Sequence, residues 1–185
     1  MTKNTRILDY GCGYGRLAEG LWREGYHRLV GVDASVEMVQ RGRQMHPHLD
    51  LRHQPQLPLP QADSSFDLVL LIGVLTSIPG DTAQQAVIGE MNRVLAPGGI
   101  ACIVDFPLQS DARNRHRYEA ARGKHHPYGV FKLEDGAVLR HHSKEWIESL
   151  TAPFETLHHS SFRATTMNGH PADAFHSLCR KPIAP

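Results

Sequence analysis

The chain has 185 residues, 41% of them hydrophobic, and its 20 Lys and Arg residues are nearly balanced by 19 Asp and Glu residues. This length predicts a single domain over residues 1–185, and the balanced charge argues against nucleic acid or a membrane as the partner. No apolar stretch approaches the roughly 20 residues of a membrane span. The three cysteines form no CxxC pair, which favours a reducing, cytoplasmic setting.

Short apolar runs alternate with segments of helical period over the first two thirds of the chain. We expect strands at residues 6–10, 28–33, 49–54, 66–75 and 100–106, and helices at 16–25, 35–45 and 81–95. Ser35 is the expected cap of the second helix and Asp81 that of the third. This alternation predicts right-handed crossovers and an α/β fold with a parallel, doubly wound sheet.

The last third of the chain shows a different pattern. A helix is expected from Ser143 to about residue 154, followed by strand-like runs at 155–167 and 172–181 that flank Asn168-Gly169, a strong hairpin signal. The sheet is therefore expected to end in an antiparallel pair. Residues 107–142 form an insertion with its own candidate hairpin, turning at Asp135-Gly136.

The turn after the first strand carries a carboxylate and glycines at alternate positions: Asp9, Gly11, Gly13 and Gly15. The third glycine comes one position too early for the dinucleotide fingerprint G-x-G-x-x-G. A carboxylate at Asp9 would also repel a pyrophosphate, but it suits a ligand with an ammonium group. Asp33 ends the second strand, where a carboxylate can accept hydrogen bonds from both ribose hydroxyls.

Four segments resemble the signature blocks of the class I S-adenosylmethionine (SAM) dependent methyltransferases: ILDYGCGYGRLAEGL, LVGVDASVEMV, LPLPQADSSFDLVLLIGVL and EMNRVLAPGGIACIVDF. They occur in the family's order and spacing and cover residues 6–106. The resemblance implies a Rossmann-like three-layer sandwich whose seven-stranded, mostly parallel sheet has an antiparallel last strand. It also implies an enzyme of the small-molecule type, which moves the methyl group of SAM to an acceptor.

The resemblance assigns the first glycine turn to the methionine part of SAM, at Asp9, Gly11, Cys12 and Gly13. It places Asp33 on the ribose, Ala34 and Met38 against the adenine, and Ile72 and Gly73 along the cofactor. The Cys12 thiol has no basic neighbour in the sequence and is expected to be packed rather than nucleophilic. The plainer alternatives are an ordinary βα turn for the glycines and a helix cap for Asp33.

One cofactor contact departs from the family pattern. Many relatives carry an acidic residue that binds the adenine amino group, whereas the aligned position here holds His53, followed by Gln54. Either side chain, or a backbone group, could make this contact. The motif N/D-P-P-Y/F is missing after the fourth strand, which argues against an exocyclic amine of a nucleic-acid base as acceptor.

The insertion is the candidate acceptor side and lid. Residues 107–144 hold eight Lys or Arg against four Asp or Glu, and five of the 13 histidines. We expect an anionic acceptor to be enclosed there, with one histidine able to take its proton. The candidate residues are Arg117, His126, Tyr128, Arg140 and His141. A solvated basic face is the alternative reading.

Three further expectations concern function. Adjacent histidines on a strand point to opposite faces, so no metal site is expected. A homodimer is compatible with the sequence. A SAM-binding module without methyl transfer, acting as a sensor or partner subunit, is the alternative function, whereas the glycine spacing and Asp9 disfavour a nicotinamide-dependent oxidoreductase.

Overall fold

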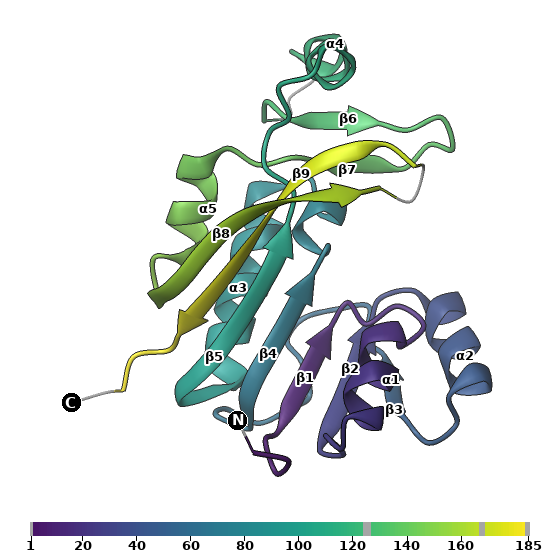
Figure 1. Cartoon of the computed structure of the whole chain (residues 1–185), viewed down its shortest axis with the longest axis vertical. Coiled ribbons are helices and arrows are strands. Elements are labelled where there is room, and N and C mark those ends of the chain that lie inside the picture. Colours follow the sequence, from purple (N-terminus) through teal and green to yellow (C-terminus); the bar gives the residue numbers. More distant parts are fainter. Residues whose placement is uncertain (1, 124–126, 167–168, 184–185) are drawn as a thin grey trace.

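The computed structural model describes residues 2–123, 127–166 and 169–183 (Figure 1). Its helices and strands alternate along the first half of the chain as the sequence predicts. In chain order they are β1 (Ile7–Tyr10), α1 (Arg16–Arg23), β2 (Leu29–Asp33), α2 (Val36–Met45), β3 (Asp50–His53), β4 (Phe66–Ile72), the 3₁₀ helix η1 (Leu75–Ser77), α3 (Asp81–Val94), β5 (Leu95–Asp105), α4 (Ala112–Ala121), β6 (Val130–Lys132), β7 (Val138–Arg140), α5 (Lys144–Thr151), β8 (Glu155–Thr165) and β9 (Pro171–Arg180).

Seven strands form one sheet in the order β3-β2-β1-β4-β5-β9-β8. The first five are parallel to one another, and β9 runs antiparallel to both β5 and β8. This confirms the doubly wound, seven-stranded sheet with an antiparallel last strand. Strand order reverses between β1 and β4, and ligands of open α/β sheets bind at the carboxyl ends of the strands at such a point.

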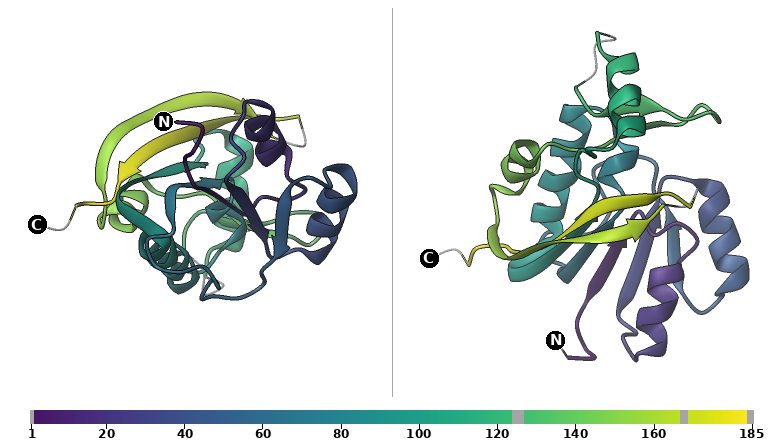
Figure 2. Two further views of the ribbon diagram at one scale, coloured as in Figure 1. Left: turned by 90° about the horizontal axis from the view of Figure 1, so that it is seen from below. Right: turned by 45° about the horizontal axis from the view of Figure 1, so that its top comes forward.

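Neighbouring residues of the central strands pack into two cores on opposite faces of the sheet. On β1, Leu8 joins the core with α3 and α5, whereas Ile7 joins the core with α1 and α2. Both residues are fully buried, as expected for parallel strands covered on both faces. Figures 1 and 2 show that α1 and α2 lie beside β1, β2 and β3, while no described helix covers the front of β5, β9 and β8.

One of the two expected helix caps, Ser35, is confirmed. The Ser35 hydroxyl accepts a hydrogen bond from the backbone N–H of Met38, and Ser143 caps α5 in the same way. The expected Asp81 cap is wrong, because Gly80 is the N-cap of α3 and Asp81 is the first helical residue. The Asp81 carboxylate lies 2.5 Å from Arg140 instead.

The insertion holds the predicted hairpin and one helix that was not expected. Strands β6 and β7 pair antiparallel, with Val130 opposite Arg140. The unexpected helix is α4, which begins after Asp111, whose side chain accepts from the backbone N–H of Asn114. Its sequence, ARNRHRYEAA, has no apolar stripe, and only Asn114 and Tyr118 of the helix are buried. Figures 1 and 2 show this segment beyond the carboxyl ends of β4 and β5.

The end of the chain forms the antiparallel pair that the hairpin signal predicts. Strands β8 and β9 pair from Thr165 opposite Pro171 to Glu155 opposite Arg180. Asn168 itself lies outside the described residues. Strand β5 begins at Leu95, earlier than expected, and its register against β4 shifts over the APGG segment. Within the described ranges, no helix has the length and apolar character needed to cross a membrane.

Candidate active site

A cavity of about 510 Å³ lies at the carboxyl ends of β1, β2 and β4, where the strand order reverses. It contains five of the residues assigned to the cofactor from sequence: Gly11, Asp33, Ala34, Gln54 and Gly73. These residues come from the ends of three different strands and from the segment after β3. The crossover topology therefore gathers residues that are up to 62 positions apart in the chain.

The glycine turn after β1 is tight for one glycine and open for another. A Cβ added to Gly11 would lie 2.3 Å from the Val74 side chain, and the φ angle of Gly11 is 76°. Gly13 also has a positive φ, but an added Cβ would meet no atom within 4 Å. Gly11 therefore lets the loops after β1 and β4 meet, whereas Gly13 leaves open space for a ligand beside the backbone.

Asp33 connects the two loops that follow β1 and β2. Its Oδ2 accepts a 2.7 Å hydrogen bond from the backbone N–H of Gly13, and its Oδ1 accepts a 2.8 Å bond from the N–H of Ser35. The helix cap itself is Ser35, so Asp33 does not serve as the N-cap of α2. Each carboxylate oxygen keeps acceptor capacity for one more donor, as a pair of ribose hydroxyls requires.

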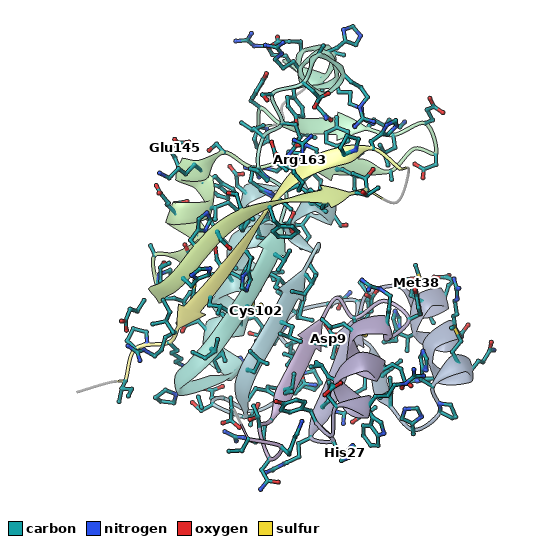
Figure 3. The ribbon with its side chains drawn as sticks, in the orientation of Figure 1. Asp9, His27, Met38, Cys102, Glu145 and Arg163 are labelled. Atoms are coloured by element: carbon teal, nitrogen blue, oxygen red, sulfur yellow. The ribbon has the colours of Figure 1, made fainter. Side chains whose placement is uncertain are left out.

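Asp9 is a buried carboxylate at the centre of the sheet, as Figure 3 shows. It is 3% exposed, and its Oδ2 makes no hydrogen bond within the described part of the chain. Burial, and then the nearby Asp33 carboxylate, raise the pKa of Asp9 to about 7. A cation bound beside Asp9 would satisfy this oxygen and favour its ionised form. The site therefore fits the ammonium end of SAM.

The other six cofactor candidates do not line the cavity: Asp9, Cys12, Gly13, Met38, His53 and Ile72. Cys12 is buried against Gly31, and burial raises the pKa of its thiol. Met38 is 41% exposed in the first turn of α2, at the upper end of this helix in Figure 3. His53 is exposed and its Nε2 lies 3.1 Å from the Ala34 carbonyl oxygen. Gln54 lines the cavity whereas His53 does not, and Ile72 ends β4 directly before the cavity-lining Gly73.

Several cavity-lining residues carry no assignment from the sequence. They come from the end of β1, from the loop before β4, from the segment that links β4 to α3 and from α3 itself: Tyr10, Gln56, Leu57, Val74, Ser77, Ile78, Ala83, Ala86 and Val87. The apolar residues after Gly73 follow a strand end at the sheet edge, which is the signal that could have identified them. Small residues on this face of α3 leave room for the cavity.

The acceptor-side candidates do not form one cluster. Arg140 is 4% exposed, binds Asp81 and the Pro79 carbonyl oxygen, and lies 4.9 Å above the Trp146 ring. Its guanidinium is therefore engaged in holding β7 against the start of α3, rather than offered to an anion. His126 lies outside the described residues.

The other three candidates lie close together in the insertion. Arg117 stacks on Phe131, His141 packs against the same ring, and Tyr128 contacts Tyr118, the hydrogen-bond partner of His141. None of the three lines the cofactor cavity. Across the described ranges, no group of three or more His, Cys, Asp or Glu side chains is arranged to hold a metal ion.

The fold is a Rossmann-like sheet with a cavity at the strand switch point, where open α/β sheets bind their ligands. The family profile described as "Methyltransferase domain" matches residues 7–99. The human "Methyltransferase-like protein 27" is 31% identical over 128 residues, which cover 68% of this chain and 51% of the relative. The chain spans about half the length of the curated relatives it matches.

Solved structures share the fold along the whole chain. A SAM-dependent methyltransferase from Methanosarcina mazei has a TM-score of 0.91 at 22% identity, covering 100% of this chain and 95% of the other. A Burkholderia thailandensis didemethyltoxoflavin N-methyltransferase, solved with its substrate and S-adenosylhomocysteine (SAH), has a TM-score of 0.67 at 18% identity, covering 97% and 72%. The chain belongs to the SAM-dependent methyltransferase family, an enzyme family whose cofactor is SAM.

Proposed function

We propose that this chain transfers the methyl group of SAM to a small-molecule acceptor that carries an anionic group. The observation that carries the proposal is the buried Asp9 oxygen, which has no hydrogen-bond partner among the described residues and precedes the cavity-lining Tyr10 and Gly11 in the chain. A carboxylate is costly in such a place unless it meets a cation. A SAM ligand would present its ammonium group to Asp9, and its ribose to Asp33.

The other contacts follow from the shape of the cavity. We assign the methionine chain to the open space beside Gly13, and the adenine to the cavity wall that includes Ala34 and Gln54. Gln54 is preferred to His53 as the partner of the adenine amino group, because Gln54 lines the cavity. SAM supplies a methyl group on a sulfonium, which is already activated for displacement, so the protein contributes mainly by positioning the acceptor.

The insertion, residues 107–142, is proposed as the acceptor-side lid. It follows β5 at the carboxyl edge of the sheet. Burial is the main cause that lowers the pKa of His141 in this segment, and the charges of Arg117 and Arg113 lower it further. The Burkholderia neighbour holds the small molecule 1,6-didemethyltoxoflavin together with SAH, which supports a small-molecule acceptor. A homodimer remains a prediction, and light scattering in solution would test it.

SAH formation separates the proposal from its alternative. Incubation of the purified chain with labelled SAM and a metabolite mixture should give SAH that depends on both the mixture and Asp33. A chain that binds SAM but forms no SAH with any acceptor would favour the sensor or partner-subunit function. A chain that binds neither SAM nor SAH would contradict both readings.

A further inference from the structure

Two adjacent buried histidines in the insertion, His141 and His142, have ring protons whose positions the neighbouring donors determine. We propose that Tyr118 fixes His141 as a hydrogen-bond donor, and that the Nε2–H of His141 binds the carboxylate of an aromatic acceptor. The proposal rests on the proposed function, because it names the acceptor class for that site. Tyr118 acts through His141 and is a positioning residue.

The Tyr118 hydroxyl determines the tautomer of His141. It lies 2.6 Å from Nδ1 of His141 and accepts a 3.1 Å hydrogen bond from the backbone N–H of Gln109. Tyr118 is 2% exposed, and a buried hydroxyl whose proton has no acceptor is unfavourable. The tyrosine therefore donates to Nδ1, and a neutral imidazole that accepts at Nδ1 carries its proton on Nε2.

Gln84 determines the opposite tautomer for His142. The indole Nε1–H of Trp146 can only donate, so the atom of Gln84 at 2.7 Å from it is the amide oxygen. The amide nitrogen of Gln84 lies 2.6 Å from the Ile78 carbonyl oxygen, 3.0 Å from the Leu75 carbonyl oxygen and 2.9 Å from Nε2 of His142, and it shares its two protons among them. Because an amide nitrogen donates and does not accept, Nε2 of His142 cannot be the donor in this contact. His142 accepts at Nε2, so its Nδ1–H donates to the Phe106 carbonyl oxygen at 3.2 Å.

Neither imidazole has a free nitrogen lone pair that could take a proton from the methyl acceptor. Burial lowers the pKa of both His141 and His142 to about 4, so both are neutral at pH 7. Both nitrogens of His142 are engaged, whereas within the described ranges no hydrogen bond involves Nε2 of His141. The two histidines therefore do not serve as the general base that the sequence suggested for this segment, and His141 is left as a donor.

The surroundings of His141 suit a planar ring with a negative group. Its ring centroid lies 5.8 Å from Phe106 and 4.8 Å from Phe131, and Arg117 stacks 4.6 Å above Phe131. Tyr128 is 47% exposed beside Tyr118. Aromatic walls bind a ring, and an imidazole N–H with a guanidinium nearby binds its carboxylate.

This cluster lies at the edge of the sheet that holds the cofactor cavity. Phe106 directly follows Asp105, the last residue of β5. The neighbouring strand β4 ends at Ile72, and the backbone N–H of the cavity-lining Gly73 donates to Val104 of β5. An acceptor held by His141 would therefore lie on the carboxyl side of the sheet, as the cofactor does.

Nitrogen-15 NMR of the imidazole rings tests the tautomers in the wild-type chain, without any variant that could fail to fold. We expect the proton of His141 on Nε2 and that of His142 on Nδ1, with assignments from His141→Gln and His142→Gln. In Tyr118→Phe the His141 signals should move toward a mixture of tautomers. A proton on Nδ1 of His141 in the wild-type chain would overturn the proposal.

Benzoate is the probe for the acceptor class, and neutral benzamide is its control, both added to the SAH-bound chain. Benzoate should shift the Nε2–H signal of His141, and His141→Leu should weaken its binding about fivefold or more, as expected for a lost charged hydrogen bond. His141→Gln places an amide N–H near the same position and should restore most of the affinity. Arg122 is an exposed cation at the C-cap of α4, and Arg122→Gln should bind benzoate as the wild type does.

The outcomes separate the two proposals. Binding of SAH without any effect of benzoate on His141, or an equal effect of benzamide, would overturn the carboxylate recognition while the proposed function stands. Unchanged benzoate affinity in a folded His141→Leu chain would do the same. Failure of SAH to bind would overturn the proposed function, and this inference with it.

Discussion

Asp9 is the residue whose chemistry links the sequence most directly to the cofactor. Its carboxylate is buried at the end of β1, and its pKa of about 7 reflects desolvation and the nearby Asp33. The sequence predicted a carboxylate that faces an ammonium group. It could not predict the burial, because burial depends on how the loops after β2 and β4 close over β1.

We predict that SAH affinity depends on pH through Asp9. Below pH 7 the free carboxylate takes up a proton, so the attraction for the ligand ammonium is lost as pH falls. Affinity should drop by up to about tenfold per pH unit from pH 7 to pH 6, and flatten above pH 7. Titration calorimetry across this range measures the effect.

Asp9→Asn is the matched control for that measurement. It keeps the shape of the side chain but cannot ionise, so its SAH affinity should be weaker and nearly independent of pH between 6 and 7. A wild-type affinity that stays constant over the same range would show that Asp9 does not meet the ammonium group.

Close packing between elements depends on glycines whose importance is visible only in three dimensions. A Cβ added to Gly42 of α2 would lie 2.5 Å from the Leu51 side chain and 2.8 Å from the Tyr14 carbonyl oxygen. Gly42 therefore allows α2 to pack closely against Leu51 of β3. Gly89 of α3 faces open space, with no atom within 4 Å of an added Cβ.

The two glycines should therefore respond oppositely to alanine. Gly89→Ala should raise the free energy of unfolding by about 0.5–1 kcal/mol, because alanine is the better helix former. Gly42→Ala should lower it by about 1–3 kcal/mol through overpacking, in spite of the same gain in helix propensity. Urea denaturation of both variants measures the difference, and a stabilised Gly42→Ala would show that α2 can shift away from β3.

The elements that the sequence predicted share a strong periodic signal. Apart from β3, which is mostly polar, the strands of the parallel sheet contain apolar runs, and the Ser35 and Ser143 caps lie directly before helical patterns. Helix α4 was not predicted because its sequence has no apolar stripe, and the helix buries only Asn114 and Tyr118. The Asp81 cap was wrong because a carboxylate in the first helical turn is favourable on its own, and Arg140 from a distant strand binds it.

Four buried titratable groups set the pH dependence of the whole fold. Burial raises the pKa of Asp9 and of Asp105 to about 7, and lowers that of His141 and His142 to about 4. Raised carboxyl pKa values stabilise the fold as pH falls through 7, because the folded state takes up more protons. Depressed histidine pKa values oppose this below pH 6.5, because the unfolded chain then takes up more protons.

We therefore predict that the chain without ligand is more stable at pH 6.5 than at pH 8. Of these four groups, only the two carboxyl groups contribute above pH 6.5, whereas between pH 6.5 and 4 the carboxyl and histidine contributions largely cancel. Thermal unfolding in matched buffers measures the difference. A melting temperature that rises from pH 6.5 to pH 8 would contradict the assignment of buried, partly protonated carboxyl groups.

The cofactor part of the candidate site can be predicted from the sequence more completely than the acceptor part. The cofactor half follows from short motifs at strand ends, and five of its predicted residues line one cavity. The acceptor half depends on contacts between segments that are distant in the sequence. Arg140 binds the Asp81 carboxylate of the same chain instead of facing an anionic acceptor. The hydrogen bond between Tyr118 and His141 joins residues 23 positions apart.

Binding of SAH, measured by titration calorimetry, tests the central claim that the cavity at the strand switch point is a SAM site. We predict one SAH per chain, no detectable binding of NAD, and a loss of about 1.5–3 kcal/mol of binding free energy in Asp33→Ala, because hydrogen bonds to a charged group are removed. Gly89→Ala, on α3, changes a residue that does not line the cavity and should bind as the wild type does. Undiminished SAH binding by a folded Asp33→Ala chain, or NAD binding as tight as that of SAH, would contradict the account.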